Sequence, residues 1–365
     1  MLHASVFRPL FAVAGFVLTQ QIFAATPAYT ITDLGNLGGA YSIVQDISLN
    51  GQVVGSSQNT GGNYRAFLWN GSMMTDLGTL GGSYSYGFGM NDTGQVVGES
   101  STAGGYRGFM YSSGVMTGLG TLGGYTSSAV DISNGGHIVG SSQTANNYDH
   151  GFVYSGSMMT DLGTLGGSNS YAKGINESGQ IVGESQIFSG ATHAFFYNNG
   201  VMTDLGAFGG TRSSANDINN SGQIVGWYVS ASGSRAFLYN AGTMTDLGTL
   251  GSTTIAYDIN NSGQIVGFSS AAAGSHAFIY SNGVLADLNS LISTDSGWTL
   301  NGAQAINDNG QVAGIGRIAG DNNDHAFLLT PVVVPVPAAF WLFGSGLIGL
   351  VAMAKRRPGN PAKDI

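Results

Sequence analysis

Histidine is the residue type in this chain best suited to acid–base or metal chemistry, and its positions follow a pattern. Four of the six histidines precede Ala-Phe or Gly-Phe, and arginine takes the same place in three further copies of that motif. The seven positions are Arg65, Arg107, His150, His193, Arg235, His276 and His325. Arginine stays protonated and has no acceptor, so it cannot replace an imidazole that binds metal or takes up a proton. The pattern predicts a structural role, and we expect no catalytic residue, metal ligand or cofactor here.

The acidic residues suggest two further kinds of chemistry. Asp217-Ile-Asn-Asn-Ser-Gly222 resembles the start of a calcium loop, but an EF-hand loop needs Glu at its twelfth position, where this chain has Tyr228. Glu99 and Glu184 occupy equivalent places in two repeats that are not neighbours, so we expect them to lie too far apart for paired acid–base work. Calcium binding and a hydrolase or lyase activity remain alternatives.

These residues belong to a unit that recurs seven times. A Gly-Gln/His-hydrophobic-hydrophobic-Gly core recurs every 41 to 47 residues, starting at Gly51, Gly94, Gly136, Gly179, Gly222, Gly263 and Gly310. A Thr-Asp-Leu-Gly motif and its variants keep step with it, centred on Asp33, Asp76, Gly118, Asp161, Asp204, Asp246 and Asp287. A period near 40 indicates one supersecondary unit repeated along the chain.

Each unit contains four short runs that read as β-strands separated by Gly, Asn and Ser. In the fifth unit the runs are Ser214–Ile218, Gln223–Val229, Arg235–Tyr239 and Thr243–Leu247. Most are rich in β-branched or aromatic residues, and none is long enough to favour a helix. The segment from Asp217 to Gly222 predicts a type I turn followed by a glycine with positive φ.

Four strands per unit predict an all-β fold, a seven-bladed β-propeller over residues 25–330. The ends of the repeat region support a closed ring. The first motif, at Asp33, belongs to a fourth strand, and the last, at His325, belongs to a third strand without a successor. We expect Tyr29–Leu34 to complete the last blade. A linear β-solenoid is the alternative.

The Arg/His and Asp motifs also predict contacts within each blade. The Asp follows the Arg or His by eleven residues, which places the two opposite each other, within one register step, across a turn such as Asn198-Asn199-Gly200. The second unit has Gly118 instead of Asp, so we expect Arg107 to be unpaired or to find another carboxylate. Ring closure would pair His325 with Asp33.

The composition narrows the range of partners. The chain has 365 residues, no cysteine and 8% charged residues, and residues 28–330 contain nineteen acids and six bases. This excess of acids disfavours nucleic acid and anionic membrane surfaces, and favours cations or neutral polar polymers. The seventh unit is longer, within Asn289–Leu300. This insertion is either a specificity loop or a local adjustment of the closing blade.

Both chain ends carry targeting patterns. Residues 1–24 read as a signal peptide with Arg8 before an apolar segment, the alternative being an uncleaved anchor. Residues 331–358 contain an uncharged run, 338–354, that is just long enough for a transmembrane helix. The cations Lys355, Arg356 and Arg357 should stay cytoplasmic with the tail, residues 359–365, and place the propeller outside the inner membrane.

Two resemblances extend these predictions. The repeats resemble the extracellular HAF repeat family, named for the His-Ala-Phe found here at His193, His276 and His325. The C-terminus resembles a PEP-CTERM sorting signal of the Val-Pro-Leu-Pro-Ala variant, although Val336 stands where the main class has Glu. The matching residues include Pro335, Pro337, Trp341, Gly344, Ser345, Gly346, Lys355, Arg356 and Arg357. The second resemblance implies processing by an exosortase-like membrane transpeptidase in an exopolysaccharide-producing bacterium. A plain single-span anchor is the alternative.

Together these patterns predict an exported, non-enzymatic protein of the cell surface or biofilm matrix, anchored in the inner membrane before processing. Its propeller would be a structural or interaction module. A carbohydrate-binding or carbohydrate-active propeller is the alternative. A binding role predicts exposed aromatic residues on one rim, and the sequence offers Tyr84, Tyr86, Tyr106, Tyr125, Tyr148, Trp227 and Trp298.

Overall fold

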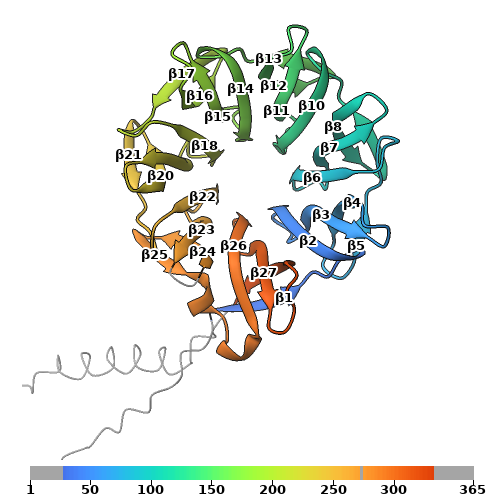
Figure 1. The fold of residues 1–365 in the computed structure, drawn as a ribbon, viewed down its shortest axis with the longest axis vertical. Helices are drawn as coiled ribbons and strands as arrows, with labels where there is room; N and C mark the ends of the chain where they lie inside the picture. The colour runs from blue at the N-terminus through green and yellow to red at the C-terminus, as the bar shows by residue number, and fades with distance from the viewer. Residues whose placement is uncertain (1–27, 272–273, 333–365) are drawn as a thin grey trace, which may run out of the picture.

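The computed structural model describes residues 28–271 and 274–332, which form a closed ring of seven four-stranded antiparallel sheets (Figure 1). This confirms the seven-bladed β-propeller and rules out a linear β-solenoid. Each sheet, or blade, corresponds to one sequence repeat. Figure 1 shows the first strand of each repeat next to the central opening.

Blades 1 to 6 each consist of four strands that are consecutive in the chain and neighbours in the sheet. Blades 1 to 3 contain β2 (Gly38–Ile47), β3 (Val53–Asn59), β4 (Tyr64–Trp69), β5 (Met74–Asp76); β6 (Ser85–Met90), β7 (Val96–Thr102), β8 (Gly105–Ser112), β9 (Val115–Gly118); β10 (Gly123–Ile132), β11 (Ile138–Thr144), β12 (Asp149–Ser155) and β13 (Met158–Asp161). Blades 4 to 6 contain β14 (Gly166–Ile175), β15 (Ile181–Ile187), β16 (Thr192–Asn198), β17 (Val201–Gly206); β18 (Ser213–Ile218), β19 (Ile224–Ser230), β20 (Gly233–Asn240), β21 (Thr243–Asp246); β22 (Thr254–Ile259), β23 (Ile265–Ala271), β24 (Gly274–Ser281) and β25 (Val284–Asp287).

Blade 7 is built from both ends of the described chain. It contains β26 (Trp298–Ile306), β27 (Val312–Ile318), β28 (His325–Pro331) and, as its outermost strand, β1 (Tyr29–Asp33). β1 and β28 are antiparallel, with Thr30 opposite Thr330 and Asp33 opposite Phe327. The predicted closure of the ring by the N-terminal strand is therefore confirmed.

The phenylalanine of each repeat forms the centre of its blade's core. All seven are fully buried: Phe67, Phe109, Phe152, Phe195, Phe237, Phe278 and Phe327. The ring packs against a glycine of the second strand, where a larger residue would not fit. A Cβ at Gly183 would lie 2.0 Å from the Tyr171 carbonyl oxygen and 2.9 Å from Phe195. This close approach explains why Ile-Val-Gly and Ala-Phe recur together.

Two kinds of turn connect the strands, and both follow from Asn and Gly. Between the first two strands of blade 5, the N–H of Gly222 donates to the Asn219 carbonyl at 3.0 Å, and Gly222 has φ +77°, as predicted. Between the last two strands of blade 4, Asn199 (φ 50°) and Gly200 (φ 84°) form a two-residue turn. Positive φ at both central residues is the mark of a type I′ hairpin.

The extra residues of the longer seventh unit pack into the closing blade. They form two short 3-10 helices, η1 (Leu288–Leu291) and η2 (Thr294–Ser296), before β26. Leu288 is fully buried in the core of the closing blade. Trp298 packs edge-on against Phe327, with ring centroids 6.0 Å apart, so this predicted rim aromatic has a packing role.

The targeting segments lie outside the described residues. They comprise the predicted signal peptide, residues 1–24, the predicted helix, 338–354, and the sorting residues from Pro335 to Arg357. Within the residues that the structure describes, no helix is both long and apolar enough to cross a membrane.

Candidate functional site

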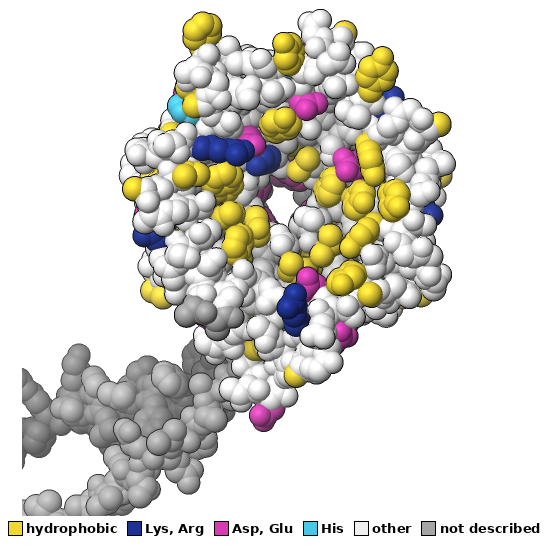
Figure 2. Space-filling model, viewed as in Figure 1, with side chains coloured by type: hydrophobic (Ala, Val, Ile, Leu, Met, Phe, Trp, Pro, Cys, Tyr) yellow, Lys and Arg dark blue, Asp and Glu magenta, His cyan; other side chains and the backbone are white. Residues whose placement is uncertain are grey.

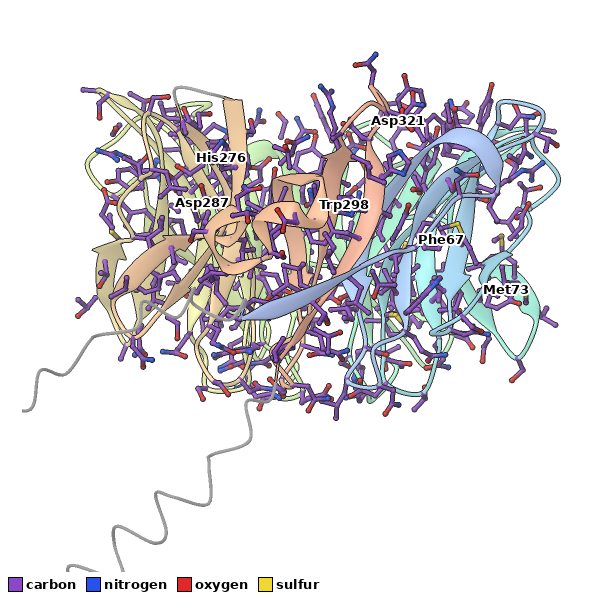
Figure 3. All side chains as sticks on the ribbon, turned by 90° about the horizontal axis from the view of Figure 1, so that it is seen from below. Phe67, Met73, His276, Asp287, Trp298 and Asp321 are labelled. Atoms are coloured by element: carbon purple, nitrogen blue, oxygen red, sulfur yellow. The ribbon has the colours of Figure 1, made fainter. Side chains whose placement is uncertain are left out.

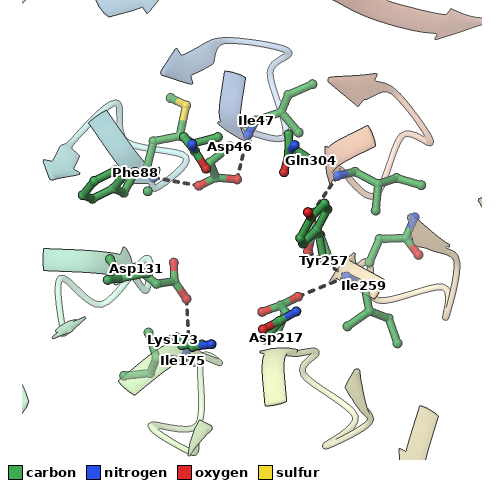
Figure 4. Close-up of a pocket in the computed structure, with 18 of the residues that line it drawn as sticks. Asp46, Ile47, Phe88, Asp131, Lys173, Ile175, Asp217, Tyr257, Ile259 and Gln304 are labelled. Atoms are coloured by element: carbon green, nitrogen blue, oxygen red, sulfur yellow. Dashed lines mark hydrogen bonds between the residues drawn. The ribbon is translucent and has the colours of Figure 1, made fainter. Parts of the chain in front are cut away.

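The first strands of the blades surround a central channel of about 720 Å³ (Figure 4). Six aspartates line it. Four of them lie in the first strands of blades 1, 3, 5 and 6: Asp46, Asp131, Asp217 and Asp258. They occupy the same place in their repeats, directly after a β-bulge in the first strand. The sequence analysis did not single out this ring, although Asp-Ile recurs at these four positions.

Each of these carboxylates connects two blades. One oxygen accepts a hydrogen bond from a backbone N–H in the next blade. The donors, with their distances to the carboxylate, are Met90 to Asp46 (2.7 Å), Ile175 to Asp131 (2.8 Å), Ile259 to Asp217 (3.1 Å) and Ile306 to Asp258 (2.6 Å). The first strands of neighbouring blades are too far apart to pair as a sheet, so the carboxylate bridges them. We call this contact the aspartate bridge.

The asparagine two residues further on makes a second kind of connection, the asparagine bridge. In blade 5 the Asn219 Oδ1 accepts from the N–H groups of Ser221 and Gln223, while its Nδ2 donates to Gln223 Oε1. The same Nδ2 also reaches the carbonyl oxygen of Asn260 in blade 6, at 3.1 Å. Equivalent bridges start from Asn91, Asn176, Asn260 and Asn307. They explain the Asn-x-Ser/Thr-Gly-Gln motif without a calcium ion.

The two bridges complement each other around the ring. The interfaces of blades 1 with 2 and 3 with 4 have the aspartate bridge, because Ser48 and Ser133 replace the asparagine. The interfaces of blades 2 with 3, 4 with 5 and 7 with 1 have the asparagine bridge, because Gly89, Gly174 and Ala305 replace the aspartate. The two remaining interfaces have both. Every blade interface is therefore bridged at least once.

Burial raises the pKa of each of the four channel aspartates that bridge blades. Burial raises the pKa of Asp46 to about 8 and that of Asp131 to about 7, and neighbouring carboxylates of the ring add to both rises. Burial likewise raises the pKa of Asp258 to about 6 and that of Asp217 well above its usual range. The backbone N–H donors oppose these rises. Across residues 28–271 and 274–332, no three His, Asp or Glu side chains are grouped so that they could hold a metal ion.

The histidine motif forms the predicted pairs with aspartate inside the blades. The Nδ1–carboxylate distances are 2.8 Å for His150–Asp161 and 2.9 Å for His193–Asp204. The distance is 2.6 Å for His276–Asp287, the pair labelled in Figure 3. His325 lies 3.6 Å from Asp33, across the closure of the ring, and 3.0 Å from Asp321. The predicted register was wrong, since the aspartate lies opposite the phenylalanine two residues on and meets the histidine diagonally.

In the part of the chain that the structure describes, the motifs that carry arginine in place of histidine do not form the predicted pairs with aspartate. Within the described residues, neither Arg65 and Asp76 nor Arg235 and Asp246 approach within 4 Å as ion pairs. The role these aspartates share is local: Asp76 Oδ1 accepts from the N–H of Gly78 at 2.8 Å, and the other Asp-Leu-Gly motifs repeat this turn. Arg107, expected to be unpaired or to find a carboxylate, donates instead to the backbone carbonyl of Tyr125.

The two glutamates considered for acid–base work lie in separate blades with different surroundings. Glu184 in blade 4 accepts hydrogen bonds from Arg212 at 3.1 Å and lies 3.6 Å from Lys173. Burial raises the pKa of Glu99 in blade 2, and a hydrogen bond from Ser128 opposes the rise. Blade 3 separates them, so they cannot act on one bond as a glycosidase pair does.

One face of the ring is rich in aromatic side chains. Figure 3 shows Asp321, in the β27–β28 hairpin, and Met73, in the β4–β5 hairpin, at opposite faces. Hydrophobic side chains gather around the opening on the face seen in Figure 2. Exposed tyrosines are Tyr84 just before β6, Tyr125 near the start of β10 and Tyr148 in the β11–β12 hairpin. Tyr86 stacks on Tyr64 with ring centroids 5.9 Å apart. We call this side the aromatic face.

The remaining predicted aromatics are partly buried. Tyr106 lies 6.4 Å from Tyr86 between ring centroids, and the Arg212 guanidinium lies 5.2 Å from the ring centroid of Trp227. Trp227 therefore joins the Glu184 cluster in a mixed aromatic and charged patch. The aromatic side chains of blades 1 to 3 and this patch together give the aromatic face ring surfaces beside polar groups.

Comparison with known proteins identifies the fold. No protein-family model matches the chain, and no curated protein matches it. The propeller domain of the Trilobed protease from Pyrococcus furiosus, described as an open velcro topology, is 8% identical, with a TM-score of 0.52, over 79% of this chain and 93% of that one. YCF48 bound to the D1 peptide is 13% identical, with a TM-score of 0.51, over 86% and 98%. A puromycin-hydrolyzing peptidase of Mycobacterium tuberculosis is 12% identical, with a TM-score of 0.52, and this chain spans 50% of it.

Proposed function

We propose that this protein is a non-catalytic interaction module of the cell surface or extracellular matrix, which binds a polar polymer through the aromatic face. The aromatic face is the observation that carries the proposal. Ring surfaces beside hydroxyl, amide and paired charged groups are typical of sites that recognise polar ligands by stacking and hydrogen bonding.

The use of the other reactive side chains supports a non-catalytic role. The channel aspartates hold neighbouring blades together, and four histidines lie against aspartates inside their blades. A general acid or base needs access to a substrate proton, and side chains held in such contacts are poorly placed for it. The two peptidase-related neighbours share only the fold, which does not fix a function.

The excess of acids directs the choice of polymer. Nineteen acids and six bases in residues 28–330 disfavour anionic partners. The basic groups Lys173 and Arg212 are paired with Glu184, and Arg317 is paired with Asp324. A neutral polysaccharide, such as a component of an exopolysaccharide matrix, fits this surface best.

Direct binding tests the proposal. The propeller, residues 25–332, is incubated with insoluble neutral polysaccharides and with alginate as an anionic comparison, and bound protein is measured after sedimentation. We expect retention on at least one neutral polymer with no release of reducing sugar. Release of sugar would favour the carbohydrate-active alternative, and failure to bind any polymer would contradict the proposal.

Export and processing are a second, separable part of the proposal. The predicted signal peptide and the PEP-CTERM-like tail support export, an inner-membrane intermediate and removal of the tail by an exosortase-like transpeptidase. A tag placed after Ile365 should disappear from the surface form while an internal tag persists. Retention of both tags in one membrane species would favour a plain single-span anchor.

A further inference from the structure

A second hollow, of about 580 Å³, lies between blades 6 and 7. Its walls come from the first strands β22 and β26 and from residues of β23, β24 and β27. Tyr257 and Gln304 line both this hollow and the central channel, so the two spaces adjoin. We call it the blade 6–7 pocket.

One wall of the pocket is aromatic. Tyr257 and Phe268 lie with ring centroids 5.8 Å apart and ring planes inclined by 32°. Both line the pocket and both are partly exposed. Adjacent rings of this kind present an apolar surface about as wide as a small cyclic ligand.

The facing wall is polar. The side chains of Thr299, Asn301 and Gln304 line the pocket, and none of them has a hydrogen-bond partner within the part of the chain that the structure describes. They supply one hydroxyl and two amide groups, each able to donate and to accept. A ligand with several hydroxyl groups could satisfy all three.

The charged groups at the pocket are paired. Arg317 Nε donates to Asp324 Oδ1 at 2.9 Å, and His276 Nδ1 lies 2.6 Å from Asp287. Among the described residues that line the pocket, each of these charged groups therefore already has a partner of opposite sign, which favours a neutral ligand.

Gly302 creates the space. The residues at its place in blades 2, 4 and 6 are Tyr86, Tyr171 and Ile255, each opposite the residue that follows the second-strand glycine. In blade 7 an additional register shift between Leu300 and Gly302 precedes the shared bulge. A Cβ at Gly302 would lie 3.8 Å from Phe268, at ordinary contact distance, so the backbone tolerates a side chain there. A large side chain would project toward the aromatic wall.

We infer that the blade 6–7 pocket binds one neutral pyranose unit of a polysaccharide. The C–H face of the sugar lies on Tyr257 and Phe268, and its hydroxyl groups exchange hydrogen bonds with Asn301, Gln304 and Thr299. This inference rests on the proposed function and gives it a location. A longer polymer would continue across the aromatic face.

Filling or dismantling the pocket tests the inference. Gly302→Tyr introduces the residue found in blades 2 and 4, and Phe268→Ala removes half of the aromatic wall. The probes are cellohexaose, maltohexaose, mannohexaose and an alginate hexamer, titrated calorimetrically into the propeller. We expect at least one neutral hexamer to bind, and each variant to weaken that binding by at least about tenfold, the equivalent of 1.4 kcal/mol.

Met73→Ala is the matched control. Met73 is 60% exposed and lies in the β4–β5 hairpin of blade 1, outside the pocket and the aromatic face, so its loss removes exposed apolar surface without touching either. Its affinity should equal that of the unaltered protein. Thermal unfolding of each variant verifies that it is folded, and Gln304→Ala replaces any variant that is not.

The outcomes separate the two proposals. Neutral hexamers that bind the unaltered protein and the Gly302→Tyr variant equally would overturn the pocket and leave the proposed function standing. Binding of the alginate hexamer alone would overturn the assignment to a neutral ligand. Absence of binding to any hexamer, together with absence of sedimentation on any polysaccharide, would overturn both.

Discussion

At the scale of single residues, the channel aspartates make stability depend on pH. Folding raises the pKa of Asp46 from 3.8 to about 8 and that of Asp131 to about 7. Between about pH 4 and 8 the native protein therefore holds more protons than the unfolded chain, so the free energy of unfolding falls as pH rises through this range. We expect the melting temperature to be lower at pH 8 than at pH 5.

Asp46→Asn should reduce this dependence. The amide cannot lose a proton, but it has one accepting oxygen for two backbone donors, Ile47 and Met90. The variant should lose about 1–3 kcal/mol at pH 5 and show a smaller further loss at pH 8. Calorimetry at the two pH values measures both effects, with Asp295→Asn in the exposed η2 helix as a control for removing one charge. If the melting temperature of Asp46→Asn fell between pH 5 and pH 8 by as much as that of the unaltered protein, Asp46 would not be a source of the pH dependence.

At the scale of strands and turns, the two bridges predict unequal losses from the same substitution. Asn176 provides the asparagine bridge between blades 4 and 5, where Gly174 supplies no carboxylate. Asn219 makes equivalent bonds between blades 5 and 6, where Asp217 also bridges to Ile259. Asn176→Ala should therefore cost about 2–3 kcal/mol and exceed Asn219→Ala, because a buried carbonyl is left without a second link to hold it. Chemical unfolding of both variants compares them, and equal losses would show that the bridges act independently.

Most strands and turns could be predicted from the sequence. The side of a strand on which a given side chain lies could not always be predicted, and this has a physical cause. The turns at Gly222 and Gly200 follow from local conformational preferences. The face on which a side chain lies depends on strict alternation along the strand, and the bulge between Ala215 and Asp217 breaks it. The sequence analysis therefore placed Asp217 at the end of a strand and the start of a turn, and did not place it in the channel. The contact of His150 with Asp161 was predicted in the wrong register for another reason. The hairpin has only two residues between Ser155 and Met158, so Asp161 lies opposite Phe152 and not opposite His150.

At the scale of the whole molecule, β1 should hold the ring closed. It buries Tyr29 against the last blade, and Leu34 directly after it is also buried. Deleting residues 25–35 should cost about 5 kcal/mol from these side chains and the lost strand pairing, and lower the melting temperature by about 10 °C. An unchanged melting temperature would contradict closure by this strand. Phe188→Ala, which removes an exposed apolar side chain elsewhere, should melt like the unaltered protein.

The closed ring could be predicted because the repeat region begins with a fourth strand and ends with a third strand. This argument needs no detail of side-chain contacts. The blade 6–7 pocket could not be predicted in this way. Gly302 reads as one of sixty glycines, and its effect depends on a second register shift in β26, between Leu300 and Gly302. The first strands β2, β10 and β14 also have a second register shift, but near their starts. The sequence shows that Gly302 differs from its counterparts in other repeats. It does not show that the space beside this glycine is lined by Tyr257 and Phe268 of the neighbouring blade.

The closing strand also imposes an order in time. Thr30 and Thr330 meet across 300 residues, so of the described strands β1 is synthesised first and its partner β28 last. Six blades can assemble from strands close together in the chain, whereas the seventh has to wait for the final strand to emerge. Until then β28 is missing and β1 is an unpaired edge, which invites pairing with other chains. A chain cut short at any point before β28 keeps the edge of β1 unpaired. The pairing of β1 with β28 therefore distinguishes chains that include the seventh blade from chains that do not.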